Sequence, residues 1–145
     1  MKKVLIGLVV GLGALAAHAD CVINHTSSSS LRRLLAERGF RFENYAAVCT
    51  KLAKANAALF IQSRAYVLAN RSIGWAIVSV KDKDSGLVDP TTDNASTYIN
   101  ADASQPTADN LMFTAAMDAI SSLDIDDAIS GLEKQRKLVG AKSRQ

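Results

Sequence analysis

The strongest candidates for chemistry are Cys21, Cys49 and His25. They are the only cysteines and the only histidine after residue 19, where a predicted signal peptide (described below) ends. An even number of cysteines in an exported protein indicates a disulfide. A catalytic thiol or a metal site would need further partners, and His25 is the only other candidate. Because His25 lies in a polar stretch with no sign of a fixed acid beside it, a Ser-His-Asp site is disfavoured. We therefore predict a Cys21–Cys49 disulfide, no catalytic residue, no metal and no cofactor.

Acidic residues supply the next candidates. Asp124, Asp126 and Asp127 could serve as paired carboxylates of a small hydrolase, which need an apolar cleft and separations of about 5–10 Å. At the start of a helix the same residues act as a cap and complement the helix dipole, and this interpretation is favoured. The run from Asp82 to Gly86 shares only its composition with a calcium loop, because glycine occupies the fifth position instead of the sixth. A turn between strands explains it better.

Trp75 is the only tryptophan of the chain. Its alternation with Ile73 and Ile77 is typical of a core strand, whereas an exposed Trp75 would anchor a partner. It joins the acids as a candidate for partner binding. The candidate partner-binding residues are Trp75, Asp82, Asp84, Asp89, Asp93, Asp124, Asp126 and Asp127.

The first 19 residues have the three parts of a secretory signal peptide. A Lys2-Lys3 start precedes an apolar run of about 14 residues, and Ala17-His18-Ala19 forms a cleavage site. The apolar run is shorter than the roughly 20 residues that span a bilayer. We expect a cleaved segment 1–19, a single domain 20–145, no transmembrane segment in the mature chain, and a periplasmic or secreted location. Asp20 before Cys21 disfavours a lipid attachment site.

Charge is segregated along the sequence. Residues 20–71 contain eight basic and three acidic side chains, residues 72–133 contain two and eleven, and residues 134–145 contain five and none. The mature chain is thus nearly neutral, which argues against nucleic acid as a partner. Whether the acidic segment 82–133 forms one surface stays open at this stage.

Helices are predicted at both ends of the domain. Leu31, Leu34 and Leu35 repeat at helical spacing before Gly39, and a second helix begins near Glu43. A third helix begins near Pro106. A fourth runs from residue 125 to 139, with acids at its start and bases near its end.

The middle of the chain predicts strands. Residues 73–80 form the clearest one, residues 82–86 a turn, and residues 98–99 a further short strand, with a loop around Pro90 and Thr92. Residues 57–70 fit both a helical and an alternating pattern. The sequence thus predicts an α+β fold, a small antiparallel meander of two or three strands flanked by helices. The alternative is an all-α bundle in which residues 57–70 extend the second helix.

These observations favour a binding protein that acts through its surface. A small exported domain without a visible active site fits an immunity or inhibitor protein against an envelope-targeting toxin or hydrolase. The alternatives are an envelope chaperone or structural protein, and a small hydrolase using Asp124, Asp126 and Asp127. A protein partner is expected, and the oligomeric state is left open.

Overall fold

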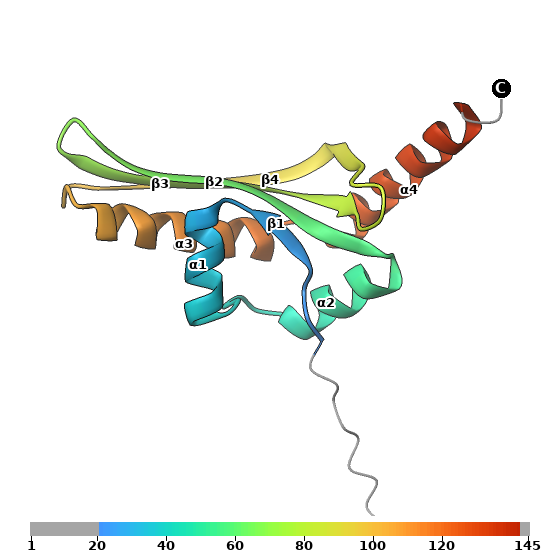
Figure 1. Cartoon of the computed structure of the whole chain (residues 1–145), viewed down its shortest axis with the longest axis horizontal. Coiled ribbons are helices and arrows are strands. Elements are labelled where there is room, and N and C mark those ends of the chain that lie inside the picture. Colours follow the sequence, from blue (N-terminus) through green and yellow to red (C-terminus); the bar gives the residue numbers. More distant parts are fainter. Residues whose placement is uncertain (1–20, 143–145) are drawn as a thin grey trace, which may run out of the picture.

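A computed structural model describes residues 21–142, so the predicted signal segment 1–19 lies outside the described part of the chain. A short strand, two helices, three long strands and two further helices follow one another along it (Figure 1). The elements are β1 (His25–Ser27), α1 (Ser29–Arg38), α2 (Tyr45–Lys54), β2 (Ala57–Leu68), β3 (Arg71–Asp82), β4 (Val88–Asn100), α3 (Gln105–Ser121) and α4 (Ile125–Lys142). The predicted α+β class is confirmed, and the all-α alternative is wrong.

The sheet has four strands in the order β1-β2-β3-β4. β2, β3 and β4 form an antiparallel meander, and β1 pairs in parallel with β2. The prediction of two or three strands therefore missed β1, whose three polar residues carry too short a pattern to recognise. It also placed a loop around Pro90 and Thr92, where β4 in fact begins at Val88. Proline is tolerated there because β4 is an edge strand.

The ambiguous residues 57–70 form β2 and the turn that follows it. Ala69 and Asn70 both have positive φ angles, 49° and 56°. Two such residues between paired Leu68 and Arg71 form the type I′ turn that matches the twist of a hairpin. The alternating pattern is thus the correct interpretation of this segment.

Serine caps mark the starts of α1 and α3. The Ser28 hydroxyl accepts a hydrogen bond from the Leu31 amide at the start of α1, and Gly39, at φ 68°, ends that helix. Ser104 caps α3 in the same way.

The predicted disulfide is present, with Cα atoms of Cys21 and Cys49 6.0 Å apart, and it ties the chain before β1 to α2.

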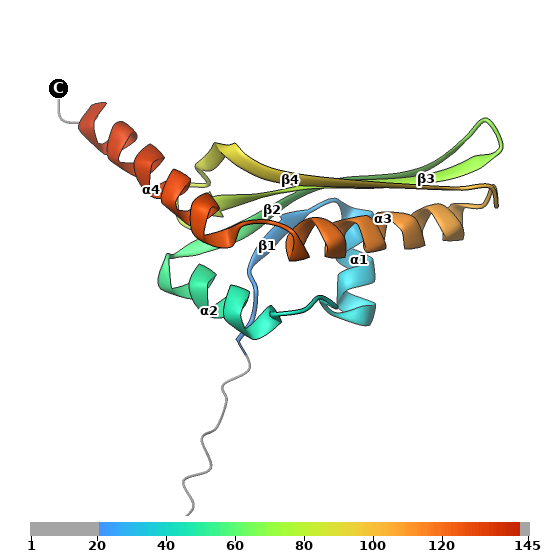
Figure 2. The same ribbon diagram turned by 180° about the vertical axis from the view of Figure 1, so that it is seen from behind.

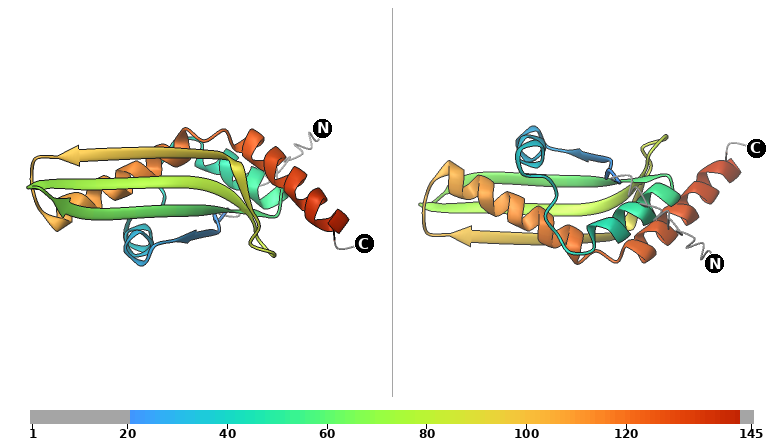
Figure 3. Two further views of the ribbon diagram at one scale, coloured as in Figure 1. Left: turned by 90° about the horizontal axis from the view of Figure 1, so that it is seen from above. Right: turned by 90° about the horizontal axis from the view of Figure 1, so that it is seen from below.

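The helices lie on one side of the sheet, and α3 runs along the three long strands (Figures 1 and 2). Three successive helix-side residues of β3 beneath α3 are small, namely Ser72, Gly74 and Ala76, and Val78 follows them. A Cβ atom on Gly74 would lie 2.1 Å from the backbone nitrogen of Met112, so only glycine allows this approach. α4 runs past the end of the sheet (Figure 3). Among residues 21–142 no helix combines the length and apolar character needed to cross a bilayer.

Candidate functional site

The sheet has a second face that no described helix covers (Figures 1 and 2). Strand alternation and the pairing register assign its side chains. We call this surface the open face. It comprises Phe60, Gln62, Arg64, Tyr66 and Leu68 of β2, Arg71, Ile73, Trp75, Ile77, Ser79 and Lys81 of β3, and Asp93, Ala95, Thr97 and Ile99 of β4.

Large apolar side chains form cross-strand rows on the open face. Tyr66, Ile73 and Ile99 lie opposite one another in one row, and Trp75 lies in the next. Leu68 and Ile99 are 60% and 58% exposed, and Tyr66 is 38% exposed. Ile73 and Trp75 are half-buried beside them. Contiguous apolar side chains that are at least partly exposed mark interaction surfaces in soluble proteins. Trp75 is half-buried and points away from the helix layer, so it does not belong to the buried core that its alternation with Ile73 and Ile77 predicted.

A hollow of about 470 Å³ lies where β1 ends beside β2. Phe60, Trp75, Gln62, Arg64 and Thr26 are among the residues that line it. The lining combines two aromatic rings with an amide, a guanidinium and a hydroxyl group. Trp, Tyr and Arg are the residue types that contribute most to binding at protein interfaces, and the open face brings Trp75, Tyr66 and Arg64 together.

Most of the predicted acidic residues lie elsewhere; only Asp93 is on the open face. Asp82 and Asp84 belong to the turn between β3 and β4, where Asp84 accepts a 2.6 Å hydrogen bond from the side chain of Asn56. The Asp82 carboxylate accepts hydrogen bonds from the amide of Ser85 at 2.6 Å and from its hydroxyl at 2.7 Å. Arg136 of α4 donates to it as well, at 2.7 Å. These donors, the Ser85 amide first, hold the pKa of Asp82 well below its ordinary value.

Asp89 is only 1% exposed and packs against α4. Its Oδ1 accepts hydrogen bonds from the amide and hydroxyl of Thr91 at 3.1 and 2.7 Å. A Cβ atom on Gly131 would lie 2.2 Å from the other carboxylate oxygen, so glycine is required where α4 passes over this residue. Asp89 is therefore inaccessible to a partner.

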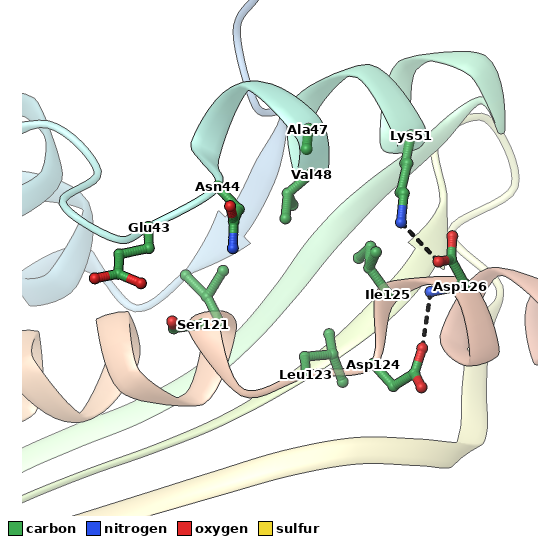
Figure 4. A pocket seen from close by; sticks show the side chains of 11 residues that line it. Glu43, Asn44, Ala47, Val48, Lys51, Ser121, Leu123, Asp124, Ile125 and Asp126 are labelled. Atoms are coloured by element: carbon green, nitrogen blue, oxygen red, sulfur yellow. Dashed lines mark hydrogen bonds and ion pairs between the residues drawn. The ribbon is translucent and has the colours of Figure 1, made fainter.

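Asp124 and Asp126 line a separate cavity of about 280 Å³ between α2 and the junction of α3 with α4 (Figure 4). Asp124 caps α4 by accepting from the amides of Asp126 and Asp127 at 3.1 and 3.0 Å. Asp126 pairs with Lys51 across the cavity at 2.6 Å. Asp127 accepts from Thr92 at 3.3 Å. The acidic segment thus does not form one surface, and its carboxylates cap helices and join elements.

His25 lies in β1 beside an aromatic cluster. Its ring contacts Phe40 edge to face, with centroids 5.2 Å apart. Within residues 21–142 no group of three or more His, Cys, Asp or Glu side chains is arranged to hold a metal ion.

Comparison with known proteins gives little similarity. The sequence matches no family model and no curated protein. A solved structure described as a "putative lipoprotein" from Caulobacter crescentus CB15 is similar at a TM-score of 0.32 and 18% identity, over 78% of this chain and 91% of that chain.

Proposed function

We propose that this chain is an exported binding protein whose open face recognises a protein partner. The observation that carries the proposal is the distribution of side-chain size along the half of β3 nearest the β2–β3 turn. The face against α3 carries small residues such as Gly74 and Ala76, whereas the face without a helix carries Trp75, Tyr66 and Ile73. A second layer supplied by a partner would bury them.

Export follows from the predicted signal segment 1–19 and is supported by the Cys21–Cys49 disulfide, since disulfides persist in oxidising compartments. Specifically, we propose that the chain is an immunity or inhibitor protein. The open face would then cover the active site of an envelope-targeting enzyme. Trp75 and Tyr66 supply the buried contact area and Arg64 pairs with an acidic group of the enzyme.

The test is capture from the envelope fraction of the source, with the chain produced as the full-length precursor and exported by the expression host. The wild-type chain is compared with Trp75→Ala on the open face and with Leu138→Ala, a matched truncation of an exposed residue on α4. We expect one stoichiometric partner that survives high salt, that is lost with Trp75→Ala and that is kept with Leu138→Ala. Inhibition of that partner's activity by the chain then establishes the inhibitor form.

Other outcomes contradict the proposal. A partner that binds Trp75→Ala and the wild type equally would place the binding surface elsewhere. Many weak partners lost at high salt would favour the chaperone or structural alternative. Trp75→Phe serves as the conservative variant, since it keeps an aromatic ring at the site and should retain most of the binding.

A further inference from the structure

The outer edge of β2 is only partly covered. β1 pairs with Leu59, Phe60 and Ile61 and then ends, because the chain turns away into α1. The Ser28 hydroxyl contacts the Ser63 hydroxyl at 2.9 Å at that point. Residues 64–68 then continue to the hairpin turn, and no strand within residues 21–142 lies beside them on this side (Figure 3).

The backbone of this free edge has hydrogen-bonding groups that point outward. The amide of Leu59 donates outward, to the carbonyl of Asn24 at 3.0 Å. Because these groups alternate along a strand, the amides and carbonyls of Ala65 and Val67 point to the same side. No strand of the described part of the chain receives them, and such an edge is a template for another extended chain.

We propose that a second copy of this chain pairs with the free edge, so that two β2 strands join antiparallel about a two-fold axis at Tyr66. The free edge of a second copy is already extended and five residues long, so its backbone needs no further ordering to match. Placing the axis at the midpoint of residues 64–68 sets Ala65 opposite Val67 of the second copy, and these two residues exchange backbone hydrogen bonds. It also sets Arg64 opposite Leu68 of the second copy, so that no like charges lie opposite one another.

The proposed pairing joins the two sheets edge to edge. It leaves both open faces uncovered and continuous with each other, and it buries part of the exposed Val67 and Leu68 side chains. This inference goes beyond the proposed function and does not depend on it. Trp75→Ala alters the open face and leaves the β2 edge intact, so failure of one proposal is distinguishable from failure of the other.

Sedimentation equilibrium of the exported chain tests the pairing through two matched proline variants. Ala65→Pro removes an outward amide from the free edge of β2, and Ala95→Pro removes one from the outer edge of β4. Neither amide bonds to β3, so both variants should fold, as circular dichroism would verify. We expect a monomer–dimer equilibrium whose dissociation constant rises about 30-fold with Ala65→Pro, because two hydrogen bonds are lost, and stays unchanged with Ala95→Pro.

Cysteine cross-linking tests the register. At the two-fold axis Tyr66 faces its own copy as a non-hydrogen-bonded pair, with Cα atoms about 4.5 Å apart, which suits a disulfide. Tyr66→Cys should therefore form covalent dimers on mild oxidation much faster than Leu68→Cys, whose copies lie several residues apart. A chain that is monomeric at all concentrations, a dimer that is insensitive to Ala65→Pro, or equal cross-linking of the two cysteine variants would overturn the proposal.

Discussion

Over residues 72–77 of β3 the two faces of the sheet carry side chains of opposite size, whereas Val78, Val80, Leu59 and Ile61 fill the helix side beyond them. Under α3 the strand β3 presents Ser72, Gly74 and Ala76, and the helix comes so close that a methyl group on Gly74 would collide with its backbone. On the open face the intervening residues of the same strand are Ile73, Trp75 and Ile77. A two-layer domain gains most from placing its large apolar side chains between the layers. This local reversal is what the proposed binding function of the open face would explain.

Removal of the disulfide should have the largest effect. Cys21 and Cys49 are 28 positions apart, and closing a loop of that length stabilises the fold by about 3.6 kcal/mol in the chain-entropy model. The Cys21→Ser and Cys49→Ser double variant should lose stability of this order in urea unfolding. Exchange at the Leu59 amide should rise as β1 loosens, which lengthens the uncovered edge of β2. A double variant as stable as the wild type would contradict this role.

The second largest loss of stability is expected when a side chain on the helix side of the sheet is made larger. Gly74→Ala places a methyl group against the backbone of α3 and should cost about 3 kcal/mol in chemical denaturation. Ile73→Ala, next to it on the open face, should cost about 1 kcal/mol, because the isoleucine side chain is only half-buried. Equal losses in the free energy of unfolding for the two variants would contradict the difference in packing between the two faces.

The ion pair at the α4 end of the helix side gives a pH-dependent effect of intermediate size. Asp82→Asn should cost about 2 kcal/mol at neutral pH, since hydrogen bonds from Ser85 and Arg136 lose a charged acceptor. Because the pKa of Asp82 is lowered on folding, its stabilisation is complete above the ordinary pKa of about 3.8 and is lost as the pH falls below it. The wild-type stability should therefore fall more steeply than that of Asp82→Asn in urea unfolding below pH 4. Parallel curves would contradict this assignment.

The smallest effect is expected on the open face. Ile99→Thr replaces a side chain that is 58% exposed and keeps the β-branched shape, so the free energy of unfolding should change by no more than about 0.5 kcal/mol. Binding of a hydrophobic dye to the folded chain should nevertheless decrease. Unchanged dye binding would show that Ile99 does not belong to the exposed apolar surface.

Much of the fold could be predicted from the sequence. The helix starts follow from Ser28, Pro106 and Asp124, and the cysteine count indicated the disulfide. β1 could not be predicted, because three polar residues become a strand only when β2 is beside them. The full length of β4 could not be predicted either, because Pro90 and a run of polar residues are typical of a loop. Their β structure depends on pairing with β3.

The candidate site was predicted less well. The acidic residues were grouped by sequence, but the fold separates them: Asp89 is buried, Asp82 pairs with α4, and Asp124 caps a helix. Trp75 was recognised as a possible anchor, whereas its neighbours Arg64 and Tyr66 were missed. The signal for them was the alternation within residues 57–70, which could be used only once that segment was known to be a strand.

The most direct test of the open face uses Trp75 as a single reporter. Incorporation of 5-fluorotryptophan gives one fluorine resonance from this chain, because it has one tryptophan, and an unlabelled partner adds none. We predict that the resonance shifts and broadens as the captured partner is added and that the change saturates at a fixed stoichiometry. A resonance that stays unchanged while the complex forms would contradict the claim that the open face is the binding surface.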